Sequence, residues 1–119
     1  MKNGYQTDMS NEEFLRISYT LMKKKIDRLI EIEKSKKKNK LPLPLIKEKF
    51  EITSKILESI RLISSLFDPT KDEKFVKELF DIFNDFGILL GQANIAEDSK
   101  TALEKYNICK IIIEGFLGE

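Results

Sequence analysis

The chain has 119 residues, of which 41% are hydrophobic and 34% charged, a composition typical of one globular domain and not of a disordered chain. Lys and Arg number 21 and Asp and Glu number 20, so the net charge of +1 excludes a general electrostatic attraction to nucleic acid or anionic membranes. The absence of histidine and the single cysteine, Cys109, exclude Ser-His-Asp and Cys-His triads, an internal disulfide and a metal site built from several thiolates.

The first residues, 1–9, show no helical period and contain Gly4, so we expect an N-terminal arm that is flexible or docked. They also lack the apolar segment of a signal peptide. No apolar run in the chain approaches the roughly 20 residues of a membrane-spanning helix. We therefore expect a cytoplasmic protein that does not insert into a membrane.

The first helix is predicted to run from Ser10 to about Glu33. Ser10 and Glu13 have the spacing of a capping box, in which the serine hydroxyl accepts from the amide three residues later. Apolar residues then recur at steps of three and four up to Ile30, which indicates one buried stripe of a helix. The lysine-rich segment 34–40 suits a helix C-terminus, where cations meet the negative end of the dipole.

The second helix is predicted to begin at Pro44, because proline is favoured at the first helical position, and to end near Phe67 before Asp68-Pro69. A second capping-box pattern, Thr70 with Glu73, predicts the start of a third helix. That helix is expected to end near residue 94, where its apolar period stops.

Asp98 or Ser99 is expected to cap a fourth helix, which ends near Phe116. No sustained period-two pattern indicates a strand. Short connections after the second and third helices predict antiparallel neighbours. The sequence therefore predicts an all-α protein, an antiparallel up-down four-helix bundle over residues 10–119 that forms a single domain behind the arm.

The third helix contains more large apolar residues than one core face requires, since a bundle helix uses about three residues in seven for that face. Either this helix is buried on several sides or part of its surface meets a partner. An apolar groove between helices is a common receptor for amphipathic helices. The lysines of segment 34–40 have no aromatic residues beside them, so a solvated loop is favoured over a nucleic-acid site.

Several short motifs occur in a characteristic order along the chain. Tyr5-Gln6 precedes the helix start at residues 10–15, and Tyr19 follows in the first helix. The third helix ends in the sequence Leu-Leu-Gly-Gln-Ala-Asn at residues 89–94, before the acidic break Glu97-Asp98. This order resembles the FliS-type family of flagellin secretion chaperones over nearly the whole chain.

Two positions depart from the family pattern. Tyr19 is followed by Thr20-Leu21, where the family often continues with aspartate and glycine, and Phe116 stands about where the family often has a tryptophan. These differences concern the shape of a binding pocket more than the fold.

The resemblance implies a cytoplasmic chaperone that binds the disordered C-terminal segment of flagellin and prevents its premature polymerisation before secretion. It implies no catalytic residue, no metal and no cofactor. By family likeness the outer apolar faces of the second and third helices would carry the flagellin segment, with Tyr5 in the covering arm. The candidate contact residues on those helices, some of them expected to be core instead, are Ile52, Ile56, Phe75, Leu79, Ile82 and Phe86.

Two other classes of protein compete with this interpretation. One is a homo-oligomeric helical adaptor without flagellin binding, in which the surplus apolar surface forms a self-interface, such as that of a weak homodimer. The other is a small nucleic-acid-binding bundle that uses segment 34–40. We expect no nucleic acid as a partner. An enzyme without histidine comes last, because no residues suggest a catalytic site.

Overall fold

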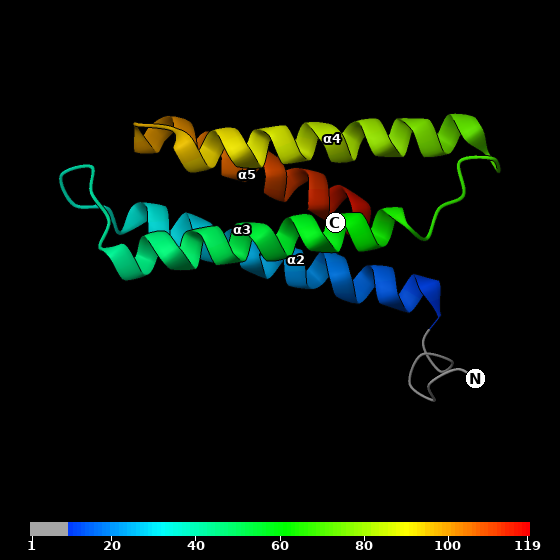
Figure 1. Ribbon diagram of the computed structural model, residues 1–119, viewed down its shortest axis with the longest axis horizontal. Coiled ribbons are helices and arrows are strands. Elements are labelled where there is room, and N and C mark those ends of the chain that lie inside the picture. Colours follow the sequence, from blue (N-terminus) through cyan, green and yellow to red (C-terminus); the bar gives the residue numbers. More distant parts are fainter. Residues whose placement is uncertain (1–9) are drawn as a thin grey trace.

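The computed structural model describes residues 10–119, and these residues form four α-helices in an up-down arrangement (Figure 1). The first and third helices run in one direction and the second and fourth run back, so each packed pair is antiparallel. This confirms the predicted all-α antiparallel four-helix bundle. The expected arm, with Tyr5, lies outside the described residues. The helices are α2 (Asn11–Lys34), α3 (Leu43–Ser64), α4 (Glu73–Ile95) and α5 (Ser99–Leu117).

The starts of α2 and α5 are fixed by the predicted side-chain caps. The Ser10 hydroxyl accepts a hydrogen bond from the Glu13 amide at 3.1 Å, and the Asp98 carboxylate accepts one from the Thr101 amide at 2.6 Å. Each bond satisfies an amide that has no partner within its own helix. At the other end of α5, Gly118 adopts the left-handed conformation with φ of 77°, which is accessible to glycine without steric cost.

The connection between α3 and α4 differs from the prediction. Helix α3 ends at Ser64, three residues before the expected Phe67. The predicted capping box of Thr70 and Glu73 is wrong, because the Thr70 amide and hydroxyl both donate to the Asp68 carboxylate, at 2.9 and 2.7 Å. Asp68, two residues before Thr70, forms a local turn, and its carboxylate binds the Thr70 amide and hydroxyl that a capping box would require.

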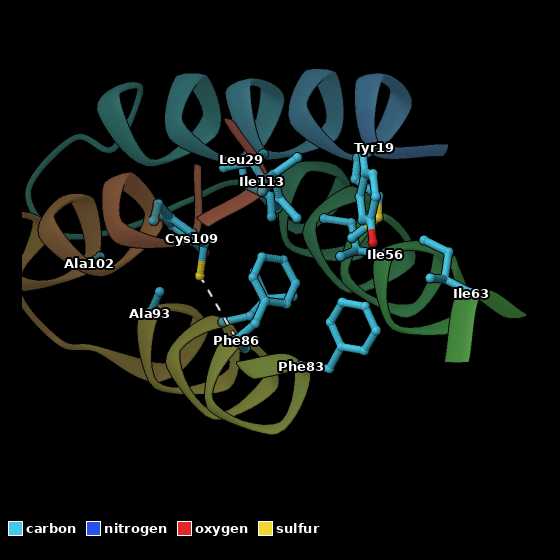
Figure 2. Packing of buried hydrophobic residues seen from close by; sticks show 14 of the residues in the cluster. Tyr19, Leu29, Ile56, Ile63, Phe83, Phe86, Ala93, Ala102, Cys109 and Ile113 are labelled. Atoms are coloured by element: carbon cyan, nitrogen blue, oxygen red, sulfur yellow. Dashed lines mark hydrogen bonds between the residues drawn. The ribbon is translucent and has the colours of Figure 1, made fainter. Parts of the chain in front are cut away.

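Each of the four helices contributes side chains to one continuous core (Figure 2). Phe86 lies at its centre with no exposed surface, and the Cys109 thiol lies beside the Phe86 carbonyl at 3.9 Å. Burial raises the pKa of Cys109 to about 12, so this thiol is a packing group and not a reactive one. At the far end of the core, Tyr19 stacks on Phe116 with ring centroids 4.9 Å apart.

Helix α3 is the least embedded of the four. Its buried side chains are those of Lys49, Ile56 and Ile63, whereas Phe50 is 59% exposed and other large apolar residues of this helix are partly exposed. Within residues 10–119, no helix is both long enough and apolar enough to cross a membrane. Part of the apolar surplus of the sequence thus lies in the core, and part lies on the outside of the bundle.

Candidate functional site

A groove with a volume of about 450 Å³ runs between α4 and α5 on the surface of the bundle. Its walls come from the middle of α4 and from the C-terminal half of α5, two antiparallel helices that pack closely together. Its shape and lining suit an apolar side-chain stripe more than a polar small molecule. The residues that line this α4/α5 groove are Ile82, Asp85, Ile111, Ile112, Gly115 and Phe116.

The α5 wall is a consequence of three consecutive isoleucines. Successive residues of an α-helix are about 100° apart, so three in a row cover too wide an arc to share one core face. Ile113 is fully buried, Ile112 is half-buried and Ile111 is 64% exposed. One turn later, a Cβ placed on Gly115 would meet open space, so the missing side chain keeps the groove wide at this end.

The floor of the groove is held by aromatic packing. Phe116 stacks on Tyr19 of α2 and lies 5.5 Å, centroid to centroid, from Phe83 of α4. Offset and tilted aromatic pairs of this kind stabilise a structure beyond the burial of their area. Phe116 therefore joins three helices under the groove, and its position does not depend on an occupant.

Of the six expected contact residues that the structure describes, only Ile82 lines this groove, and it is 40% exposed. Ile52 is half-buried and packs against the core from α3. Phe75 is 49% exposed but lies at the start of α4, tilted against Phe67 with centroids 6.1 Å apart. Tyr5 is outside the described residues.

The other three candidates, Ile56, Leu79 and Phe86, are core residues. Ile56 and Phe86 have no exposed surface and Leu79 is 6% exposed. Leu79 and Phe86 are two helical turns apart, in the same stripe that buries Phe83 and Leu90. They are therefore not part of an exposed partner surface, which corrects their assignment to the outer face of the helix.

Sequence reasoning missed the α5 side of the groove, which supplies Ile111, Ile112 and Phe116. The three consecutive isoleucines could have indicated this wall, because three successive residues of a helix span too wide an arc for all of them to be buried. The sequence could not show which helix α5 packs against, since that neighbour is set by the tertiary arrangement.

A second feature absent from the expectations is a buried polar cluster at the end of the bundle where α2 finishes. Glu33 is 1% exposed and Lys49 is 6% exposed, and their charged atoms Oε1 and Nζ lie 3.6 Å apart. Glu33 Oε2 also accepts from Ser99 Oγ at 2.8 Å and pairs with Lys36 Nζ at 2.8 Å. A carboxylate at the start of α5 also suits the positive end of that helix dipole.

The cluster continues through Asn94 of α4. Its backbone carbonyl accepts from Lys49 Nζ at 3.1 Å, its amide nitrogen donates to Thr53 Oγ1 at 2.7 Å, and its amide oxygen accepts from the Tyr106 hydroxyl. Residues from all four helices are thus joined in one network. Such networks fix how helices align along one another, because a shifted arrangement would leave buried polar groups unsatisfied.

The apolar period of the sequence indicates that two charged residues of this cluster are buried. Glu33 lies seven residues after Ile26, and Lys49 lies seven residues before Ile56, so both continue a buried apolar stripe at two-turn spacing. A charged residue at a core position of the period indicates either a helix end or a buried pair.

The pKa of Glu33 reflects a balance between burial and the groups bound to the carboxylate. Burial alone would raise the pKa of this carboxyl, but the bonds from Lys36 and Ser99 and the charge of Lys49 together lower it. Burial also lowers the pKa of Lys49, against the opposing effect of Glu33. Among the described residues, Glu33 Oε1 accepts no hydrogen bond. The Lys49 ammonium group is close enough to oppose the charge of this oxygen, but it does not donate a hydrogen bond to it.

The cost of replacing Glu33 by glutamine is expected to depend on pH. The folded-state pKa of Glu33 lies below its ordinary value of 4.5, so the folded state binds fewer protons than the unfolded state in that range. The stabilisation is present above pH 4.5 and is lost as the pH falls through the folded-state pKa. We expect the difference in unfolding free energy between wild type and Glu33→Gln to shrink from about pH 7 to about pH 3 in urea titrations. A constant difference would contradict this.

Comparison with family models, with curated proteins and with solved structures finds no match for the chain. Within the part of the chain that the structure describes, no group of three His, Cys, Asp or Glu side chains is placed to hold a metal ion. Of the two features described above, the apolar groove is open to a partner, whereas the polar cluster is buried.

Proposed function

We propose that this protein is a cytoplasmic export chaperone that binds the disordered C-terminal segment of flagellin and prevents its polymerisation before secretion. The observation that carries the proposal is the α4/α5 groove, an open apolar channel with exposed isoleucines, Ile82 and Ile111, on its two walls. The order of motifs that resembles the FliS-type chaperones supports flagellin as the bound protein, or guest.

The groove suits a guest that folds as it binds. A disordered segment gains contacts by forming an amphipathic helix, whose apolar stripe enters the groove and whose polar face remains in water. Each large apolar side chain removed from water contributes about 1.5–3 kcal/mol, and this must exceed the cost of ordering the segment. Such binding requires no nucleotide and no chemical step.

The two features of the structure have separate roles in this proposal. The groove supplies apolar contacts, while the buried cluster around Glu33 and Asn94 fixes the relative positions of the four helices. A groove that is already formed spares the guest the cost of ordering its receptor, so more of the contact free energy appears as affinity.

The direct test is calorimetric titration with the C-terminal segment of flagellin from the same organism, long enough to form two amphipathic helices. We expect one-to-one binding with a large negative heat-capacity change, which reports burial of apolar surface. No heat at two temperatures, together with no co-migration in size-exclusion chromatography, would contradict the proposal.

Introducing a charge into the groove is expected to weaken flagellin binding without unfolding the bundle. The variant Ile111→Asp places a carboxylate on the α5 wall at a side chain that is 64% exposed, so the core is untouched. We expect roughly a tenfold to hundredfold loss of affinity, the range of an interface residue of central importance. The matched control is Phe50→Asp on α3, which is 59% exposed and does not line the groove. Equal losses in both variants would place the binding surface elsewhere.

A homo-oligomeric adaptor remains the second candidate, because α3 also exposes large apolar side chains. Leu57 and Leu62 are 44% and 45% exposed, beside the more exposed Phe50. A self-interface over α3 would give a stable dimer by light scattering that is unaffected by flagellin. A monomer that becomes a one-to-one complex supports the chaperone instead.

A further inference from the structure

We infer that the guest helix in the α4/α5 groove carries basic residues along the edge that meets α4. This inference rests on the proposed function for the identity of the guest as flagellin, and on the groove alone for the chemistry of the guest. The inference is based on the charged residues at the edge of the groove, because apolar contacts alone do not distinguish one amphipathic helix from another.

The α4 edge of the groove is acidic. Glu78 and Asp85 are exposed and two helical turns apart on the groove side of α4, whereas Asp81 lies on the adjoining outer side, beside a hollow that it shares with Lys77 and Phe80. Lys74 is exposed on this outer side as well, and among the described residues it forms no ion pair with Glu78. Asp85 lines the groove itself, next to Ile82. Any helix seated in the groove therefore places its own flanking residues near these carboxylates.

These carboxylates have little compensation from the protein itself. Among residues 10–119, the one ion pair on this edge joins Lys77 to Asp81 at 3.6 Å, with side chains that are 76% and 68% exposed. An exposed pair of this kind contributes little and is screened by salt. Asp85 forms no ion pair with any residue that the structure describes.

Two lysines, on α5 and α2, form ion pairs away from the groove. Lys110 of α5 pairs with Asp27 of α2 at 2.8 Å, and Lys23 of α2 pairs with Glu114 of α5 at 3.1 Å. Both pairs bridge α2 and α5, whereas the groove lies between α4 and α5. They neutralise charge on the α2 side of α5 and leave the α4 edge negative.

The C-terminal end of α5 adds further negative electrostatic potential at the groove. The groove includes Gly115 and Phe116, in the last turn of a helix that ends at Leu117. The C-terminal end of a helix carries partial negative charge from its carbonyl groups, and this charge favours cations. An apolar channel with a negative edge and a negative end complements a helix with an apolar stripe and basic flanks. It disfavours acidic helices and anionic lipid or nucleic-acid surfaces.

The test uses two designed amphipathic peptides of about 18 residues, or roughly five helical turns. They share one apolar stripe and differ only at the flanking positions, which are lysine in one peptide and glutamate in the other. We expect the intact protein to bind the lysine peptide about fivefold more tightly at low ionic strength, because one exposed charge pair contributes up to about this factor. The preference should decrease as salt is added.

Variants of the protein assign the preference to the α4 edge. In Asp81→Asn/Asp85→Asn the difference between the two peptides should shrink, because Glu78 and the end of α5 still favour cations, and in Asp85→Lys it should be smaller still, because a cation then stands in the groove itself. The matched control is Glu51→Gln, which removes an exposed carboxylate from α3 and should retain the preference. Circular dichroism checks that each variant is folded. A preference that is unchanged in Asp85→Lys, or two peptides that bind equally, would overturn the inference.

The same variants titrated with the flagellin segment separate this inference from the proposed function. If flagellin does not bind but the lysine peptide does, the proposed function fails and the inference about guest chemistry stands. If flagellin binds equally to wild type and Asp85→Lys, the proposed function stands and the inference fails. If neither peptide binds at millimolar concentration, the groove is not a helix receptor and the inference fails.

Discussion

The variant Phe86→Ala is expected to lower the free energy of unfolding by about 3–5 kcal/mol, the range for truncating a fully buried phenylalanine. Phe86 has no exposed surface and lies where side chains of all four helices meet, so the bundle cannot collapse into the space that its ring leaves. Domains of ordinary stability unfold with about 5–15 kcal/mol. The variant Phe86→Asp, which buries a charge in the same place, is expected not to fold.

Urea denaturation followed by circular dichroism measures this loss. The matched control is Phe75→Ala, the same truncation on the same helix at a side chain that is 49% exposed, and it should cost much less. Similar losses for the two variants would contradict the placement of Phe86 at the centre of the core. A folded Phe86→Asp variant that merely lost partner binding would contradict it as well.

The variant Lys49→Met is expected to cost about 3–5 kcal/mol, the range for removing one partner of a buried ion pair. Lys49 opposes the charge on Glu33 Oε1 from 3.6 Å, and it also donates to the Asn94 carbonyl at the end of α4. Without the ammonium group, the buried Glu33 Oε1 loses its nearest opposite charge and the partly buried Asn94 carbonyl loses its hydrogen-bond donor. Lys36 and Ser99 continue to bind the other carboxylate oxygen, so the loss falls short of complete unfolding.

The second half of this prediction concerns the double variant Glu33→Leu/Lys49→Met. Replacing both members of a buried pair by apolar residues is often neutral, so the double variant should recover most of the loss. The coupling free energy from a double-mutant cycle measures the pair separately from its surroundings. Additive losses in the two single variants would show that Glu33 and Lys49 do not act together.

Features set by neighbouring residues could be predicted from the sequence, and those set by tertiary contacts could not. The caps at Ser10 and Asp98 are local hydrogen bonds over three residues, and both are present. The capping box predicted at Thr70 is also a local feature, but it does not form, because the Thr70 amide and hydroxyl donate to the Asp68 carboxylate instead. The period of apolar residues predicted helices and their order, which sufficed for the bundle.

The site was less accessible to sequence reasoning than the fold. The apolar period of α4 shows a wide stripe but does not say which part of it another helix covers. Ile82 and Phe86 are four residues apart and alike in hydrophobicity, yet one is 40% exposed and the other is fully buried. The difference is set by where α5 lies, and the same neighbour supplies Ile111 and Phe116 to the groove. Only a tertiary arrangement contains that information.

The shallow burial of α3 has a consequence for how the molecule opens. Helices α2, α4 and α5 share most of the interior, whereas α3 adds chiefly Ile56 and Ile63 to it. Local stability follows the density of buried contacts, so we expect native-state amide exchange to be graded across the chain, with the amides of α3 exchanging first among the four helices. Partial detachment of α3 would then precede global unfolding, and segments with such low-energy openings are where proteases first cut.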